Sequence, residues 1–157
     1  MTSTTTLEIN GAKITVDTSE LFRAWFERQL DKPSTSSFAV PAARSGERYL
    51  CSIIEPSGQV RHTFLLPGDE EVPSWDSGMA FAKNLGGDLP DRIEQAMFLV
   101  HMPEEFKKDA YWSNTQHAGN SYYAWFQNFR YGDQSGHDES RKLRVRAVRR
   151  EFSNIVI

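Results

Sequence analysis

The sequence has one cysteine, Cys51, among its 157 residues. A single thiol excludes an internal disulfide framework and every zinc site that needs several cysteines. Cys51 lies in the apolar run YLCSII without a basic neighbour that could activate a thiolate. We therefore expect a small reduced residue of the core.

Strong charge and long apolar runs are also lacking. The formal net charge is −3, so no overall field attracts the chain to nucleic acid or to a membrane surface. No apolar run approaches the length of a membrane span, and MTSTTT lacks the basic flank and apolar core of a secretory signal. We expect no membrane insertion, no secretion and no nucleic-acid partner.

The motifs of common enzymes are absent as well. The sequence has no Walker sequence, no dinucleotide-binding glycine pattern and no GxSxG elbow. Its four histidines, His62, His101, His117 and His137, are too far apart for a local metal-binding spacing. We therefore predict a non-enzyme without a metal or cofactor.

The chain opens with a predicted hairpin and helix. LEINGAKITV indicates two strands joined by a tight turn at Asn10 and Gly11, with Ile9 opposite Ala12. A helix should follow Asp17 as its N-cap. Its expected inner face consists of Leu21, Phe22, Trp25, Phe26 and Leu30. Residues 1–32 are thus a candidate element for oligomerisation or docking.

A Ser-, Pro- and Ala-rich segment, residues 33–45, is typical of a loop or linker. Residues 46–157 form the predicted main domain. It should begin with a hairpin of residues 48–54 and 59–66 around the turn sequence EPSG.

Two helices should follow in this domain. The first is capped by Ser74 and stopped by Gly86. Asp91 and Glu94 form a capping-box pattern for the second, which ends before Pro103. The expected apolar stripes are Trp75, Gly78, Met79, Ala82 and Leu85 for the first helix, and Ile93, Ala96, Met97 and Val100 for the second.

From Tyr111 onward the pattern favours strands. YYAWFQNF and KLRVRAVRREF should be short strands of a final antiparallel sheet, separated by a polar turn around YGDQSGHD. Trp112 and Trp125 should fill the core between the helices and this sheet. The fold class is therefore α+β with antiparallel sheets and two central helices.

Six blocks in this order carry a family resemblance: PSWDSGMAFAKNLGG, LPDRIEQ, AYWSNTQ, YYAWFQNF, YGDQ and RVRAVRRE. The region from Gly46 to Phe152 resembles the Lcl C-terminal domain family, named for a collagen-like bacterial adhesin and similar to stand-alone phage and prophage proteins. The resemblance implies a C-type-lectin-like fold related to formylglycine-generating enzymes. Those enzymes use a cysteine pair, and the EPN triplet of calcium-dependent lectins has no counterpart here. The resemblance therefore implies a binding protein.

A ligand surface is the leading functional hypothesis. Aromatic and amide side chains, which suit recognition loops, gather after residue 113. The candidate ligand-binding residues are Asn114, His117, Asn120, Tyr122, Tyr123, Gln127, Tyr131, Asp133, Gln134 and His137. The alternative is that alternating members of YYAWFQNF simply bury one face of a strand and solvate the other.

A second candidate site lies in RKLRVRAVRR, where Arg144 and Arg146 should share one strand face. Such a face could bind a polyanion or a sulfated glycan through bidentate contacts. The alternative is internal neutralisation by acidic residues such as Asp138, Glu139 and Glu151.

The resulting hypothesis is a non-catalytic phage or prophage protein that recognises a protein or glycan target through its loops. It would act in the virion or in the bacterial host cytoplasm. The alternative is an intracellular phage effector that binds and inhibits a host defence protein. The sequence encodes no heptad or collagen stem, so the number of copies in a homo-oligomer stays open.

Overall fold

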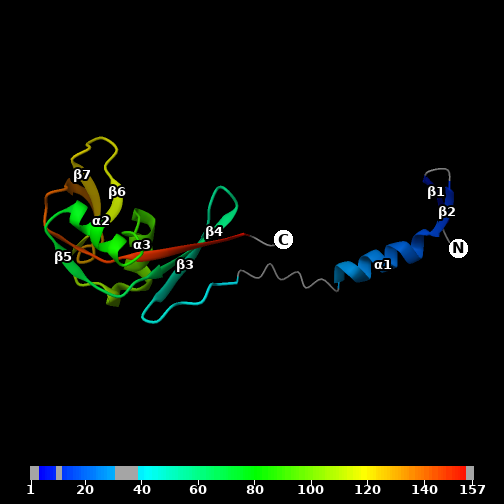
Figure 1. The fold of residues 1–157 in the computed structure, drawn as a ribbon, viewed down its shortest axis with the longest axis horizontal. Coiled ribbons are helices and arrows are strands. Elements are labelled where there is room, and N and C mark those ends of the chain that lie inside the picture. Colours follow the sequence, from blue (N-terminus) through cyan, green and yellow to red (C-terminus); the bar gives the residue numbers. More distant parts are fainter. Residues whose placement is uncertain (1–3, 10–11, 31–38, 155–157) are drawn as a thin grey trace. The chain divides into compact units, whose positions relative to one another are not determined.

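A computed structural model describes residues 4–9, 12–30 and 39–154 of the chain. These residues fall into two compact units (Figure 1): the first holds residues 4–9 and 12–30, and the second holds residues 39–154. Helices and mainly antiparallel strands alternate irregularly along the chain. The fold class is α+β, as the sequence predicts.

The first unit is a hairpin followed by a helix. Strands β1 (Thr4–Ile9) and β2 (Ala12–Asp17) are antiparallel with Ile9 opposite Ala12, the predicted register. The predicted turn residues Asn10 and Gly11 lie outside the described residues. Helix α1 (Thr18–Leu30) begins directly after β2, and the Asp17 carboxylate accepts the Ser19 backbone N–H at 2.9 Å. Asp17 is therefore the N-terminal cap that the sequence predicts.

The aromatic residues of the predicted inner face of α1 are exposed, and the prediction that this face packs on another part of the chain or on a partner is not tested by the first unit alone. Phe22, Trp25 and Phe26 are 64%, 55% and 48% exposed, and they contact one another, with ring centroids 5.9 Å apart for Phe22–Trp25 and 6.1 Å for Phe22–Phe26. The side chains of Leu21 and Leu30 lie outside the described residues. Among the described residues of the first unit, β1 and β2 adjoin α1.

The second unit contains a three-stranded antiparallel sheet in the order β10-β4-β3. Strands β3 (Arg48–Ile54) and β4 (Gln59–Leu65) form the predicted hairpin. Its turn is closed by a 2.8 Å hydrogen bond from the Gly58 N–H to the Glu55 carbonyl, with Gly58 at a φ of +82° that favours glycine. Strand β10 (Val148–Asn154) then pairs with β4, so β4 is the central strand.

A five-stranded sheet has the order β5-β9-β6-β7-β8. Its strands are β5 (Glu70–Val72), β6 (Ala110–Gln116), β7 (Tyr123–Asn128), β8 (Gln134–Asp138) and β9 (Leu143–Val145). The expectation of a wholly antiparallel late sheet is wrong, because β9 runs parallel to β6 with Arg144 opposite Tyr111. After β8 the chain crosses over β7 and β6, so that β9 lies next to β6 on the side away from β7 and runs in the same direction as β6.

Two predicted segments are divided differently in the structure. The polar turn predicted around residues 131–138 ends by Asp133, because the rest forms β8, whose polar and glycine residues carry no apolar signal. The predicted strand KLRVRAVRREF is split into β9 and β10, which belong to different sheets. Strand β5 was not predicted, since EEV is too short and too acidic to show a strand pattern.

Three helical segments lie between β5 and β6 in the sequence: α2 (Trp75–Asn84), α3 (Arg92–His101) and the 3₁₀ turn η1 (Pro103–Glu105). The Ser74 hydroxyl accepts the Ser77 N–H at 3.2 Å, which caps α2 as predicted. Asp91 and Glu94 form the predicted capping box at the start of α3. Within the described part of the chain no helix is both long and apolar enough to cross a membrane.

The core lies on both faces of β6. Trp112 is fully buried on the α2 side, as predicted, in a cluster with Leu89 and Val145. Its neighbour Tyr111 is buried in a second cluster with Phe98 of α3. Successive side chains of a strand point to opposite faces, so α2 and α3 cover opposite faces of this sheet.

The predicted apolar stripe of α2 is largely correct. Gly78 and Ala82 are buried and Trp75 and Met79 pack against the core, while Leu85 is exposed.

The predicted apolar face of α3 is wrong. Ile93 and Val100 are 62% and 69% exposed, Ala96 is also exposed and Met97 is half-buried. The buried face instead consists of Glu94, Gln95 and Phe98. Glu94 and Gln95 have hydrogen-bond partners inside the unit, so burial of their polar groups is compensated. Periodicity of apolar residues cannot reveal such partners.

We predict that Gly87→Ala lowers the free energy of unfolding by about 2 kcal/mol or more. A methyl group at residue 87 would collide with the Val148 carbonyl oxygen and lie 2.8 Å from Leu66 Cδ1. Urea unfolding measures the change. The matched control is Gly86→Ala, whose methyl group meets nothing within 4 Å and costs about 1 kcal/mol through its φ of +74°. Equal losses for the two variants would contradict the packing argument.

Candidate functional site

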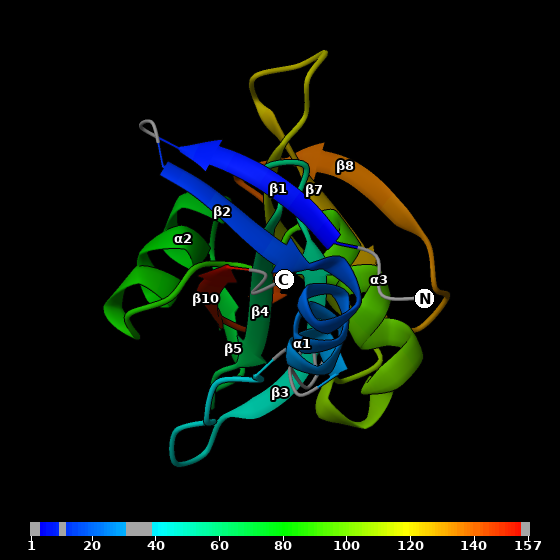
Figure 2. The same ribbon diagram turned by 90° about the vertical axis from the view of Figure 1, so that its right-hand side faces the viewer.

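The predicted ligand residues lie on β6, β7, β8 and their connections, and all except Asn114 form two separate groups. One group surrounds the β6–β7 loop, which projects from the second unit (Figures 1 and 2). The other surrounds the β7–β8 turn. Because β7 spans six residues at about 3.3 Å each, these groups are about 17 Å apart or more. A small ligand can therefore contact only one of them.

The β6–β7 loop is held in one shape by its own hydrogen bonds. The His117 N–H donates to the Tyr123 carbonyl at 2.7 Å, and the Tyr123 N–H donates to the Asn120 carbonyl at 3.1 Å. The Asn120 side-chain oxygen accepts the Tyr122 N–H at 3.0 Å, and His117 Nδ1 accepts the Gly119 N–H at 3.1 Å. Tyr122 is 75% exposed and Tyr123 is 36% exposed. The loop thus presents two tyrosines on an ordered backbone.

Trp125 supports this loop from β7. The Arg92 guanidinium of α3 lies 3.6 Å above the Trp125 ring. The His117 ring stacks on the same Trp125 ring, with the two centroids 5.2 Å apart. Gly136 is opposite Trp125 on β8, and a methyl group there would lie 3.0 Å from His117 Cδ2. The expectation that Trp125 fills the core is therefore wrong: it is a half-buried platform between an arginine and a histidine.

Gln134 fixes the arginine of this platform. Arg92 Nε donates to Gln134 Oε1 at 3.1 Å, and Gln134 Nε2 donates to the Arg92 carbonyl at 2.7 Å. Both polar ends of the amide are therefore in use. Gln134, a predicted ligand residue, positions the platform instead of facing outward.

His137 lies beside Tyr123, with parallel rings 6.4 Å apart. Arg141 Nη1 lies 2.7 Å from His137 Nε2, within hydrogen-bond distance. Nδ1 is buried and has no hydrogen-bond partner among residues 39–154 and the other described parts. Arg141 is exposed, which adds a cation to the tyrosine surface.

The second group is at the β7–β8 turn. Tyr131 is 76% exposed and Asp133 is exposed. Asn128 Oδ1 accepts the Arg130 and Tyr131 N–H groups at 2.9 and 3.3 Å, which orders this turn. Gln127, a predicted ligand residue, is 1% exposed and donates to the Asp133 carbonyl at 3.1 Å. Gln127 is therefore part of the scaffold.

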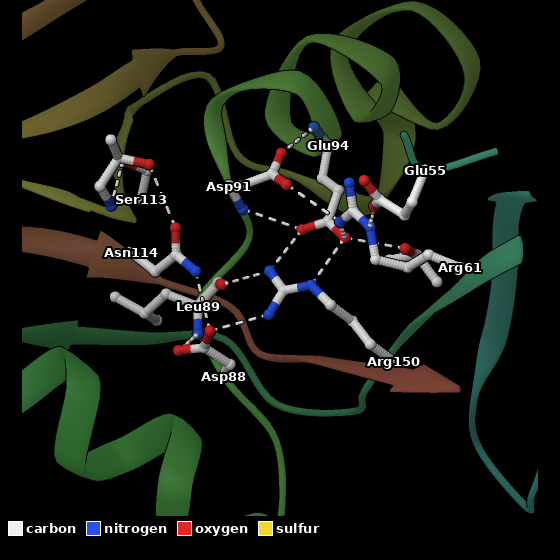
Figure 3. Close-up of polar contacts among 11 residues, drawn as sticks. Glu55, Arg61, Asp88, Leu89, Asp91, Glu94, Ser113, Asn114 and Arg150 are labelled. Carbon is white, nitrogen blue, oxygen red and sulfur yellow. Dashed lines mark hydrogen bonds and ion pairs between the residues drawn. The ribbon is translucent and has the colours of Figure 1, made fainter. Parts of the chain in front are cut away.

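Asn114 is half-buried and belongs to a polar network that surrounds Glu94 (Figure 3). Its Nδ2 donates to Asp88 at 2.8 Å, and Asp88 also accepts Arg150 Nη1 at 2.8 Å. Arg150 then binds the fully buried Glu94 through Nε at 2.9 Å and Nη2 at 2.6 Å. Hydrogen bonds and the charge of Glu94 outweigh burial, so the pKa of Arg150 lies above its usual value.

Glu94 joins three elements through this network. Arg61 Nη1 of β4 donates to Glu94 at 2.6 Å and to Asp91 at 3.0 Å, and Thr63 donates to Glu94 at 2.8 Å. Arg61 also pairs with Glu55. The network neutralises the buried Arg61 and the half-buried Arg150 by ion pairs, so neither arginine is free to bind a ligand.

The predicted polyanion residues are also in ion pairs. Arg144 donates to Asp69 through Nε at 2.9 Å and Nη2 at 2.6 Å. Arg146 donates to the Leu66 carbonyl at 3.0 Å and pairs with Glu105 at 3.1 Å. These contacts match the alternative of internal neutralisation, although the acidic partners differ from those expected.

Two further groups complete the chemistry of the second unit. Cys51 is a free, half-buried thiol on β3, and burial raises its pKa. Burial likewise raises the pKa of Tyr111, which donates to Asp69 at 2.9 Å, to about 12. Among the described residues no three His, Cys, Asp or Glu side chains are arranged to hold a metal ion.

The sequence did not identify Arg92, Trp125 or Arg141 as parts of the surface. Arg92 acts through a strand 33 positions later, which no local pattern reveals. Gly136 in an otherwise polar strand was the available signal, since a glycine within a strand often marks a close approach.

Comparison with protein-family models, with curated proteins and with solved structures finds no match.

We predict that Glu94→Gln lowers the free energy of unfolding by about 3 kcal/mol or more, because it leaves Arg61 and Arg150 buried without their shared carboxylate. Chemical unfolding measures the change. The control is Glu104→Gln, which removes an exposed ion pair with Arg48 and should cost under about 1 kcal/mol. A loss at Glu94 no larger than the control would show that the network contributes no stability.

Glu47 should make stability depend on acid pH. Its hydrogen bonds from Arg149, at 2.8 Å, are the main reason that its pKa falls from 4.5 to about 2. A carboxylate with a depressed pKa stabilises the fold above its unfolded pKa and loses that effect as pH falls toward the folded value. The stability difference between the wild type and Glu47→Gln should therefore shrink between pH 4.5 and about 2. Thermal unfolding across this range measures it, and a constant difference would contradict the assignment.

Proposed function

We propose that the second unit is a C-type-lectin-like domain that binds a protein or glycan target without chemical transformation. The family resemblance to the Lcl C-terminal domain supports this fold. The arrangement of the unit is consistent with it, because the last strand, β10, returns to pair with β4 of the first hairpin and the two helices lie between them in sequence.

The observation that carries the proposal is the ordered β6–β7 loop. It presents Tyr122 and Tyr123 beside Asn120, His137 and Arg141. Ordered loops lose little conformational entropy on binding, and tyrosine supplies a large contact area with few rotatable bonds. We name Asn120, Tyr122, Tyr123, His137 and Arg141 the loop surface.

This surface suits recognition better than the β7–β8 turn does. It has two tyrosines beside an exposed arginine, whereas the β7–β8 turn has the single exposed ring of Tyr131 with Arg130 5.8 Å from its centroid. The shared features of a protein or glycan ligand would be apolar faces that contact the tyrosine rings and hydrogen-bonding groups that meet Arg141 and Asn120.

The test compares two tyrosines of equal exposure. A glycan array and a pull-down from a bacterial host lysate, with and without protease treatment, identify the class of ligand. Tyr122→Ala should then weaken binding about tenfold or more, and Tyr131→Ala should leave it unchanged, although the two side chains are almost equally exposed at 75% and 76%. Isothermal titration measures both.

Three outcomes would contradict the proposal: no ligand in either screen, equal effects of the two substitutions, or a stronger effect of Tyr131→Ala. Tyr123→Ala gives an independent check, since its ring lies against His137 at the base of the loop.

A further inference from the structure

The two sheets of residues 39–154 end in edge strands: β3 and β10 in one sheet, and β5 and β8 in the other. An edge strand presents backbone N–H and C=O groups that another strand can bind, and natural proteins protect such edges with bulges, charged side chains or covering segments. Strand β3 has a bulge between Tyr49 and Cys51, and β5 is a short strand with two glutamates. Strand β10 carries two arginines and a glutamate, and its Val148 exchanges backbone hydrogen bonds with Asp88.

Strand β8 lacks this protection. Its sequence QSGHD has no proline, lysine or arginine, and its acidic residue, Asp138, is at its end. It pairs with β7 in an uninterrupted register from Gln134 to Asp138. Ser135 is exposed, and Figure 2 shows β8 at the outer edge of its sheet. The second unit therefore has an edge that an extended chain can bind.

The hydrogen bonds at the two ends of the β7–β8 ladder fix its phase. The Asn128 N–H donates to the Asp133 carbonyl at 2.8–2.9 Å, the distance at one end being 2.9 Å, and the Glu139 N–H donates to the Tyr122 carbonyl at 2.9 Å at the other end. In an antiparallel ladder, pairs that exchange hydrogen bonds alternate with pairs whose backbone groups point away from each other. Both end pairs belong to the first kind, so the residues between them can be assigned in turn.

This alternation assigns the backbone groups of β8. Ser135 and His137 bond to β7, whereas the N–H and C=O groups of Gln134 and Gly136 point to the free edge. The Asp138 N–H points the same way, but its carbonyl accepts the Arg141 N–H at 3.0 Å. Among residues 39–154 no backbone group outside the ladder bonds to Gln134 or Gly136. An additional strand can therefore bond to both residues.

Gly136 also indicates which side chain an additional strand would carry. It is opposite Trp125, and a methyl group at residue 136 would lie 3.0 Å from His117 Cδ2. Directly opposite residues of neighbouring strands point to the same face of a sheet. A residue paired with Gly136 from the free edge thus directs its side chain to the face that holds the rings of Trp125 and His117. An apolar side chain suits this position.

We propose that β8 binds an extended peptide segment of a target protein as an additional strand, with an apolar side chain opposite Gly136. In this mode of recognition, main-chain hydrogen bonds supply affinity and alternate side chains supply specificity. The inference rests on the proposed function, because His137 of the loop surface belongs to β8. It narrows the ligand to a protein with an extended segment.

Hydrogen exchange of the full chain, followed by NMR, tests the free edge without any ligand. The Gly136 amide should exchange about 10²-fold faster than the His137 amide, which is bonded to β7. Equal protection of the two amides in dilute solution would overturn the proposal. Protection of Gly136 that rises with protein concentration alone would indicate pairing with a second copy, and would overturn it as well.

Random linear peptides displayed on phage are the probe for binding. Gly136→Pro removes the outward N–H, which the β7–β8 ladder does not use, and should weaken binding of a selected peptide about tenfold or more. Gly136→Ala is the matched control, because it places a carbon beside His117 but keeps the N–H, and it should weaken binding less. Failure to select any peptide, or equal losses for the two variants, would overturn the proposal.

A second measurement leaves the protein unchanged. N-methylation of a selected peptide, one residue at a time, should weaken binding to the wild type about tenfold at every second residue, because alternate residues of a strand face its partner. Losses without this alternation would show that the peptide does not bind as a strand.

Failure of this proposal is distinguishable from failure of the proposed function. A glycan ligand, or a protein ligand whose binding depends on Tyr122 but not on Gly136, would overturn the peptide-strand proposal and leave the loop surface as a binding site. The absence of any ligand would contradict both, although hydrogen exchange at Gly136 would still report whether the edge is free.

Discussion

The buried carboxylate of Glu94 is the interaction on which the second unit depends most. It begins α3 through the capping box and binds Arg61 of β4 and Arg150 of β10. These bonds fix the start of α3 relative to the three-stranded sheet. Arg92, two positions before Glu94, then lies over Trp125 and supports the β6–β7 loop. A polar contact in the interior thus determines the geometry of a surface on the outside.

This network also explains why α3 is polar inside and apolar outside. A helix normally buries its apolar stripe, but here Glu94 and Gln95 point inward while Ile93 and Val100 face solvent. Replacing a whole buried ion network by well-packed apolar residues often costs little stability, whereas removing one partner leaves the others buried and unpaired. Arg61 and Arg150 both donate hydrogen bonds to Glu94, so the position of this carboxylate fixes the position of the start of α3.

Local rules predicted the elements whose causes are local. The turn at Gly58, the Ser74 cap and the Asp91–Glu94 capping box depend on residues within a few positions of one another, and the structure has all three. The failures have long-range causes. Polar residues gained partners 31 to 56 positions away, as Thr63 and Arg150 did with Glu94, and the burial of α3 followed those partners. Strand β9 lies between β5 and β6, on the side of β6 away from β7 and β8, and the periodicity of its residues does not encode this position.

The same distinction applies to the candidate site. Composition placed the recognition residues in the right region, since Tyr122, Tyr123 and Tyr131 are exposed. It could not separate ligand residues from scaffold, because an amide such as Gln127 or Gln134 is suited to either role. Only the partner of each amide decides, and those partners are set by tertiary structure.

The construction of the β6–β7 loop has a consequence for how its specificity could change during evolution. His117, Asn120 and backbone groups hold the loop, whereas the exposed side chains of Ala118, Ser121 and Tyr122 contribute none of its described hydrogen bonds. Substitutions at these three positions can alter shape and chemistry at the tip at little cost to folding. New ligands can therefore be acquired by drift at the tip while the framework is preserved.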